Sequence, residues 1–304
     1  MGDQIIMFIS QIFNGLKIGS VYSLVALGYT MVYGIIRLIN FAHGEIYMLG
    51  AFTALLVAGV LGIVGFPAGG ILIVAALAAV VWSAAYGYTL EKVAYKPLRG
   101  APRLSPLISA IGMSIFLQNY VLLAQTSDYV PFPRLLPEME FLDYLGNIMG
   151  PSDFLILVTS TLAMVSLSLF IRYTRMGKAM RATAQNRKMA LLLGINADRI
   201  ISLTFIVGSA LAALGGVLIA SHMGQVNFGI GFLAGLKAFT AAVLGGIGSI
   251  PGAMVGGLVL GIAESMTTGY LSGNYEDALA FALLILILIF RPDGILGKAK
   301  VQKV

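Results

Sequence analysis

The chain has 304 residues, of which 59% are hydrophobic and only 11% are charged. Soluble domains carry about 25% charged residues, so this composition excludes an ordinary soluble protein and favours one whose outer faces contact lipid. The net charge of +6 is explained by basic loops of a membrane protein rather than by nucleic-acid binding. The absence of cysteine excludes a disulfide framework and thiolate metal sites.

Nine apolar runs predict helices in chain order, since a hydrocarbon core of about 30 Å takes roughly 20 helical residues and lipid does not tolerate open strand edges. The runs span 12–34, 46–64, 69–90, 105–124, 153–171, 200–221, 233–247, 252–270 and 278–290. The first predicts a membrane helix, with room for a short interfacial segment before it, and not a cleavable signal. The expected fold is one transmembrane domain over residues 1–304, an all-α bundle of about eight or nine hydrophobic helices.

Basic residues orient the chain in the membrane. Segments 91–104, 172–199 and the tail from Arg291 together hold fifteen of the nineteen Lys and Arg residues. The positive-inside rule therefore places these three segments in the cytoplasm and the acidic loop 125–152 outside. Counting crossings from these loops puts the N-terminus outside and the C-terminus inside. Nine crossings satisfy this count, and so do seven if 233–270 is a re-entrant hairpin.

Paired small residues indicate close helix packing. Gly15 and Gly19, Gly252 and Gly256, and Gly257 and Gly261 each follow the spacing that lets helix backbones approach in a membrane. Together they predict a compact bundle.

A polar segment at 37–45 interrupts the apolar pattern between the first two helices. Asn40 is expected to cap the following helix, and Glu45 falls in its first turns, where the helix dipole favours a negative charge. The segment is either a capped interfacial turn or a broken helix that lines a cavity or gate. His43 has no second His at ligand spacing, so we expect no metal site and no cofactor.

A glycine-rich segment at 245–252 predicts a second break. Gly245, Gly246 and Gly248 form either a tight turn between antiparallel helices or a gate close to the pathway. A helical hairpin turning there places Lys237 and Glu264 at matching depth, about 20 Å from the turn. These two residues are candidates for an intramembrane ion pair, which is either structural or part of a path.

The basic segment 172–199 predicts one or two short helices outside the membrane. Lys178 to Leu193 are good helix formers, Gly194 is a natural helix stop, and Asn196 can cap the next helix. The segment is either a linker bound to lipid headgroups or a docking surface for a cytoplasmic partner. Small and apolar residues alternate with charged ones, which favours docking.

Motifs along nearly the whole chain resemble the LivH-type permeases, the membrane subunits of bacterial ABC importers for branched-chain amino acids. The resemblance rests on these segments: Asn14-Gly15, Gly28-Tyr29-Thr30-Met31-Val32-Tyr33-Gly34, Ile39 to Glu45, Ile108 to Ser114, Arg175-Met176-Gly177, Arg181-Ala182, Gly194-Ile195-Asn196, Lys237 to Ser249 and Pro292 to Gly297. The least familiar stretch is 125–152.

This resemblance implies a subunit without enzymatic activity in the bacterial inner membrane. It implies a second, homologous permease, two cytoplasmic ATPase subunits and a periplasmic substrate-binding protein as partners. It makes 172–199 the coupling loop, with Gly177, Arg181, Ala182 and Gly194 as the coupling residues, and 125–152 a candidate contact for the binding protein. The expected function is import of leucine, isoleucine and valine by alternating access driven by ATP.

Two alternatives stay open at the level of sequence. A related permease for urea, amides or other amino acids shares the same architecture, because the binding protein usually sets substrate choice. A stand-alone channel or secondary transporter is the alternative from a different class, although the sequence offers only Glu45 and Glu264 as candidates for the buried carboxylates that an ion-coupled carrier needs. The sequence has no phosphate-binding loop and no nucleophile–base motif.

Overall fold

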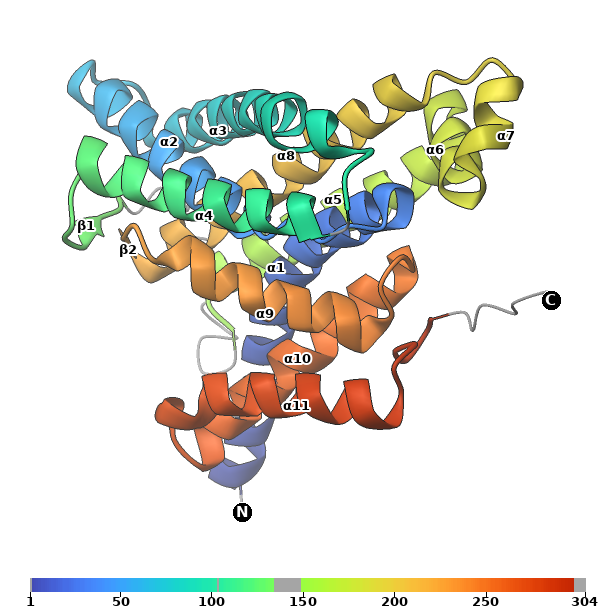
Figure 1. Cartoon of the computed structure of the whole chain (residues 1–304). Helices are drawn as coiled ribbons and strands as arrows, with labels where there is room; N and C mark the ends of the chain where they lie inside the picture. The colour runs from blue at the N-terminus through green and yellow to red at the C-terminus, as the bar shows by residue number, and fades with distance from the viewer. Residues whose placement is uncertain (1, 103, 134–148, 298–304) are drawn as a thin grey trace.

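The computed structural model describes residues 2–102, 104–133 and 149–297, and these are almost entirely helical (Figure 1). The first half comprises α1 (Gly2–Ile36), α2 (His43–Ile63), α3 (Ala68–Leu90), the π-helical turn η1 (Glu91–Tyr95), the 3-10 turn η2 (Lys96–Leu98), α4 (Leu104–Ala124) and β1 (Val130–Pro131). The second half comprises α5 (Pro151–Tyr173), α6 (Arg175–Gln185), α7 (Arg187–Leu192), α8 (Ala197–Met223), β2 (Gln225–Val226), α9 (Ile230–Gly245), α10 (Ile250–Tyr270), the 3-10 turn η4 (Gly273–Tyr275) and α11 (Glu276–Phe290). Arg103, most of the predicted outside loop (134–148) and the tail lysines after 297 lie outside the described residues.

Eight of the described helices are long and apolar enough to cross a membrane, and α9 is a shorter apolar helix. The predicted all-α membrane bundle of eight or nine helices is confirmed. Large apolar side chains cover its outer faces, among them Val81, Leu123 and Phe290, which are 67%, 85% and 76% exposed. Such surfaces are stable against lipid tails and unstable against water.

The bundle has two different ends (Figure 1). At one end α6 and α7 project, and at the other β1 pairs with β2. Helix α9 starts directly after β2 and ends at a turn that contacts residues 293–297 and lines the same cavity as Arg181 of α6. Its 16 residues rise by about 24 Å. The helix starts deeper in the bundle, because Gly231 lies against Gly44 and Glu45 at the start of α2. The two-pass and re-entrant forms of 233–270 both stay predictions.

Helices α1 and α10 pack against each other along the predicted glycine positions. A methyl group on Gly15 would meet the backbone at Gly261 and Ile262, and one on Gly19 would meet the backbone at Gly257. The small residues thus let the two antiparallel backbones touch, as their spacing indicates.

Two local features differ from the expectations. Helix α1 is continuous from Gly2, so no separate interfacial segment precedes it. Strands β1 and β2, of two residues each, were not expected; Phe132 extends their pairing with a 2.8 Å hydrogen bond from its N–H to the Gly224 carbonyl. Two-residue strands are too short to produce a period in the sequence.

Candidate functional site

The chain reverses direction between α1 and α2. Arg37, the first residue after α1, has a φ of 54°, a left-handed conformation that costs a non-glycine residue about 1–2 kcal/mol. After this reversal His43 lies against Gly28 of α1 and Gly208 of α8. Helix α2 therefore begins in the bundle interior, and the predicted break is a broken helix rather than a capped interfacial turn.

Asn40 does not cap α2, so that prediction is wrong. Ala42 occupies the N-cap position without a side-chain hydrogen bond. The side-chain oxygen of Asn40 instead accepts a 2.8 Å hydrogen bond from the hydroxyl of Tyr95, and both residues are 1% exposed. The backbone N–H of His43 is satisfied by the Asn40 carbonyl at 3.0 Å, which leaves the side chain free for the distant partner.

His43 and Glu45 lie beside Asn40 in the chain and are both 0% exposed. Glu45 accepts a 2.9 Å hydrogen bond from the hydroxyl of Ser114 on α4. The His43 ring lies edge-on to Tyr29, with ring centroids 4.9 Å apart. We name the buried set of Tyr29, Asn40, His43, Glu45, Tyr95 and Ser114 the polar centre.

The glycine-rich segment forms a tight turn between α9 and α10. Gly246 and Gly248 have φ values of 107° and 94°, which side-chain-bearing residues rarely adopt. The tail after α11 closes over this turn, because Ile295 and Leu296 donate 2.9 Å hydrogen bonds to the carbonyls of Leu244 and Gly245. The geometry is that of the turn between antiparallel helices, and a gating role stays a prediction.

The structure brings Lys237 and Glu264 together. The Lys237 ammonium lies 3.5 Å from the Glu264 carboxylate, and the side chains are 8% and 4% exposed. The ammonium also contacts Glu276 at 3.0 Å and Asp277 at 2.7 Å, and Tyr22 of α1 donates a 2.8 Å hydrogen bond to Glu264. This Lys237 cluster joins α1, α9, α10 and α11, and the sequence did not indicate its last three members.

The four candidate coupling residues lie in or beside α6 and α7, but their contacts with the rest of the chain differ. Thr174 caps α6 by accepting a 3.0 Å hydrogen bond from the N–H of Gly177. A methyl group on Gly177 would collide with the backbone at the end of α5. Ala182 is half-buried on α6, and Gly194 has a φ of 79° after α7, as a helix stop requires.

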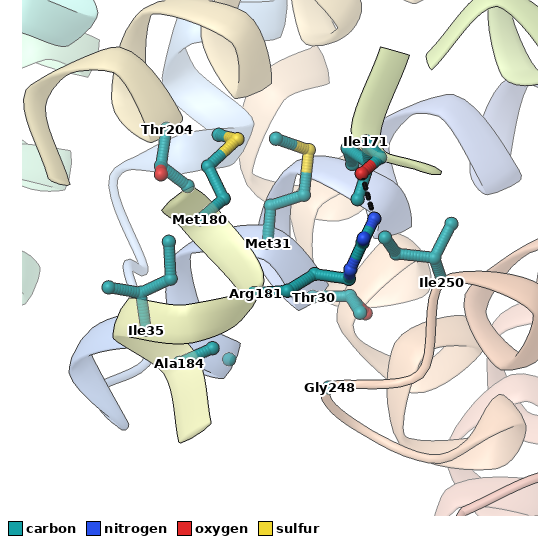
Figure 2. A pocket seen from close by; sticks show the side chains of 11 residues that line it. Thr30, Met31, Ile35, Ile171, Met180, Arg181, Ala184, Thr204, Gly248 and Ile250 are labelled. Carbon is teal, nitrogen blue, oxygen red and sulfur yellow. Dashed lines mark hydrogen bonds between the residues drawn. The ribbon is translucent and has the colours of Figure 1, made fainter. Parts of the chain in front are cut away.

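Arg181 faces back toward the bundle. Its guanidinium donates to the carbonyl of Ile171 and, at 3.1 Å, to that of Arg172, so it satisfies carbonyls that end α5. Figure 2 shows it beside a cavity of about 100 Å³ among the ends of α1, α5 and α8 and the turn before α10. The cavity is mainly apolar, with Thr30 and Arg181 among its polar side chains. Arg181 thus fixes how α6 leaves α5.

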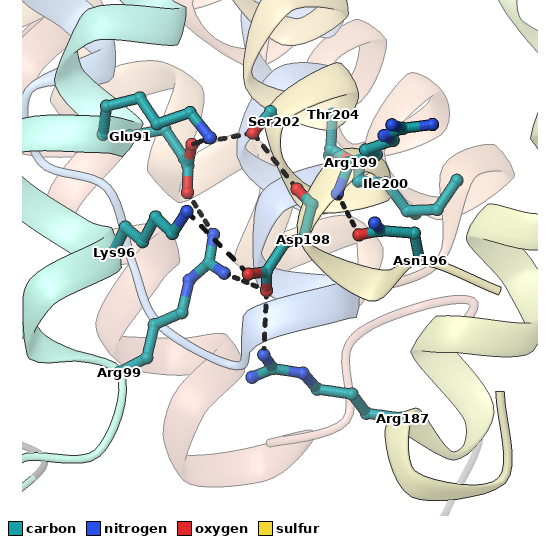
Figure 3. Close-up of polar contacts among 11 residues, drawn as sticks. Glu91, Lys96, Arg99, Arg187, Asn196, Asp198, Arg199, Ile200, Ser202 and Thr204 are labelled. Carbon is teal, nitrogen blue, oxygen red and sulfur yellow. Dashed lines mark hydrogen bonds and ion pairs between the residues drawn. The ribbon is translucent and has the colours of Figure 1, made fainter. Parts of the chain in front are cut away.

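An ion network at the same end was missing from the sequence expectations (Figure 3). Arg99, after η2, pairs with Glu91 of η1 and with Asp198 of α8, the latter at 2.5 Å. Arg187 of α7 reaches the same oxygen of Asp198 at 3.2 Å. These residues are distant in sequence, and they lie in segments that the sequence analysis used only to assign the membrane orientation. No local pattern could therefore predict the pairing.

A second unexpected group lies at the β1–β2 end. Lys17 of α1 is 2.9 Å from Asp153 of α5 and 3.0 Å from the ring of His222 on α8. Its side chain is 4% exposed. The group ties three helices together at the end of the bundle opposite α6 and α7.

Comparison with known proteins gives consistent matches. The family described as "Branched-chain amino acid transport system / permease component" matches residues 11–288. The chain is 52% identical to the high-affinity branched-chain amino acid transport system permease protein LivH of Escherichia coli (strain K12), over 100% of both chains. It is also 52% identical to the permease protein BraD of Pseudomonas aeruginosa, over 98% of each chain.

Proposed function

The chain belongs to the family of permease components of branched-chain amino acid transport systems, and from this premise we propose that it carries leucine, isoleucine and valine into the cytoplasm. The observation that carries the proposal is the match to LivH at 52% identity over the full length of both chains. A match of this extent includes every helix of the bundle, so the whole transport unit is shared. The chain acts as the non-catalytic membrane subunit of an ABC importer in the bacterial inner membrane.

The orientation follows from charge. Lys96 and Arg99 contact Asp198 at the end of the bundle where α6 and α7 project, and Lys92 contacts Glu91 beside them. The positive-inside rule makes this the cytoplasmic end. The β1–β2 end is then periplasmic, with the N-terminus outside and the C-terminus inside. In this orientation the loop 125–152 is available to a periplasmic binding protein.

We propose that α6 and α7 dock on a cytoplasmic ATPase subunit. Large apolar side chains are exposed here outside the membrane spans: Met189, Leu191, Leu192 and Leu193 are 53%, 53%, 81% and 76% exposed. An exposed apolar patch on and just after a short projecting helix is suited to a protein partner. Gly177 and Arg181 position this surface against α5, while Ala182 and Gly194 shape it.

The transport path passes close to the polar centre in this proposal. A broken helix leaves backbone and side-chain polar groups at mid-membrane, where polar substrates need them. Asn40, His43 and Glu45 are all fully or almost fully buried. Partner ATPases would open the path by moving α6 and α7, and a homologous second permease would complete the membrane unit.

The test is transport by the reconstituted complex. The chain, its second permease and two ATPase subunits are placed in lipid vesicles, and uptake of labelled leucine is measured with and without ATP and binding protein. We expect uptake only when both are present, with isoleucine and valine competing and urea and acetamide not competing. Uptake by the lone chain without ATP would contradict the proposal, and competition by urea alone would assign a different substrate.

A further inference from the structure

A continuous series of polar contacts connects α7 with the polar centre. It begins at Arg187, which pairs with Asp198 in the first turn of α8. Asp198 holds Arg99 through the same carboxylate oxygen. The helix start is fixed independently, because the side chain of Asn196 accepts a 3.1 Å hydrogen bond from the N–H of Arg199. Asp198, whose side chain is 44% exposed, therefore contacts both α7 and the segment after α3.

The next member is Glu91, which is 0% exposed although it carries a charge. It accepts hydrogen bonds from Arg99 and, at 2.8 Å, from the hydroxyl of Ser202 on α8. A buried carboxylate depends on such partners, since an unpaired charge at this position costs several kcal/mol. Arg99 is only 13% exposed. If Arg99 moves, Glu91 is therefore expected to move with it, because water cannot easily replace Arg99 as the partner of this carboxylate.

Glu91 opens η1, a π-helical turn of five residues that ends at Tyr95. Single π-turns inside α-helices occur frequently at functional sites, because they change the direction of side chains without ending the helix. The hydroxyl of Tyr95 donates the 2.8 Å hydrogen bond to Asn40 in the break before α2. Its ring also packs on Phe205 of α8, with centroids 5.2 Å apart. The two ends of η1 thus contact the ion network and the polar centre.

Helix α7 has few other attachments to the bundle. Of its residues only Ala190 is buried, at 1% exposed, and Leu192 is 81% exposed. Within the described residues, Arg187 is the only charged side chain of α7 that forms an ion pair. A movement of α7 reaches α8 through the short connection 193–196 as well as through Asp198, and the polar contacts to the segment after α3 run through Arg187, Asp198 and Arg99.

We propose that Arg187, Asp198, Arg99, Glu91, Tyr95 and Asn40 form a relay that transmits movement of α7 to the break before α2. The residues are positioning residues. The turn η1 connects the ion network at Glu91 with the polar centre at Tyr95. This inference rests on the proposed function, because it requires that α7 is moved by an ATP-hydrolysing partner. Loss of one link leaves ATP hydrolysis intact and disconnects it from transport.

The test cuts the relay at either end with matched controls. Tyr95→Phe removes one hydroxyl and keeps the ring, and its control is Tyr88→Phe on the same helix, where the ring is 44% exposed. Arg187→Gln removes one charge, and its control is Arg291→Gln, an exposed residue at the end of α11 outside the α6–α7 segment. Each complex is reconstituted, and the ATP hydrolysed per leucine imported is measured along with co-purification of the ATPase.

We expect both relay variants to retain the ATPase and to raise the ATP hydrolysed per leucine about three- to tenfold, the equivalent of one hydrogen bond. The controls should keep the parent ratio. The double variant Tyr95→Phe/Arg187→Gln should be no worse than the more affected single variant, because a serial connection is broken only once. A purely structural role would lower uptake and hydrolysis together and leave the ratio unchanged.

Two outcomes would overturn the relay. One is an unchanged ratio in both relay variants while the parent complex shows ATP-dependent uptake. The other is an additive effect in the double variant. If the parent complex itself shows no ATP-dependent uptake, the proposed function fails first, and the two failures are thereby distinguished.

Discussion

Replacing Lys237 with methionine should destabilise the protein more than any other single charge removal in the Lys237 cluster. Lys237→Met keeps the length and apolar stem of the side chain and removes only the ammonium. Three carboxylates then lose their counter-charge. Glu264 is affected most, because its side chain is 4% exposed, whereas Glu276 and Asp277 are 41% and 45% exposed.

The magnitude follows from this difference in burial. Removing one partner of a buried ion pair costs about 3–5 kcal/mol, because the remaining charge is left without compensation. The contacts to the two exposed carboxylates are screened by solvent and contribute about 0–1 kcal/mol each. We therefore expect Lys237→Met to lower the free energy of unfolding by about 4 kcal/mol. Glu276→Gln, the exposed control, should lower it by less than about 1 kcal/mol.

The assay is unfolding of the purified chain in detergent micelles with increasing SDS, followed by loss of helical circular dichroism. The double variant Lys237→Met/Glu264→Gln removes both buried charges and should recover most of the lost stability, since Tyr22 can still donate its hydrogen bond to the new amide. The reasoning is refuted if Lys237→Met stays within about 1 kcal/mol of the parent. A double variant less stable than the single one would refute it equally.

Three further substitutions test other contacts. Gly44→Ala should destabilise the chain by about 1–3 kcal/mol in the same SDS assay, because the new methyl group would lie 2.7 Å from the Cα of Gly235. Its control is Gly59→Ala, whose methyl group would have no neighbouring atom within 4 Å, and this variant should be neutral or stabilising. Leu192→Asp should leave stability within about 0.5 kcal/mol and reduce recovery of the ATPase on affinity purification; full recovery would contradict docking through α7. Arg181→Gln should cost about 0.5–1 kcal/mol, because the carbonyls at the end of α5 lose their donor while Arg181 itself is exposed. An unchanged unfolding curve would show that Arg181 does not hold α6.

The sequence predicted features that depend on helix geometry within one hairpin. Lys237 and Glu264 come together because thirteen and fourteen residues separate them from Ile250, and helical rise places them at equal depth. The spacing of the glycines in α1 and α10 identified them as packing positions. It did not indicate that these two helices pack on each other. The stop at Gly194 and the cap at Asn196 are also local, and both are confirmed.

Features that depend on distant partners could not be predicted. Asn40 fits the local pattern of a helix cap, yet Tyr95, 55 residues away, binds its side chain. Arg181 was expected to face a partner protein because it is a basic residue in a cytoplasmic loop. The structure adds a contact to α5, where α6 packs back on the preceding helix at Gly177, and Arg181 stays exposed, so its role in coupling remains a prediction. The break at Asn186 between α6 and α7 likewise exposes Leu191, which a continuous helix would have aligned with the buried Met180.

Transport by this chain is tested by leucine uptake into vesicles that contain the complete complex, compared with vesicles that contain every subunit except this chain. Both preparations receive ATP inside and the binding protein loaded with labelled leucine outside. We expect accumulation above the external concentration only when this chain is present and ATP is hydrolysed. Equal accumulation without the chain, or accumulation through the chain without ATP, would contradict it.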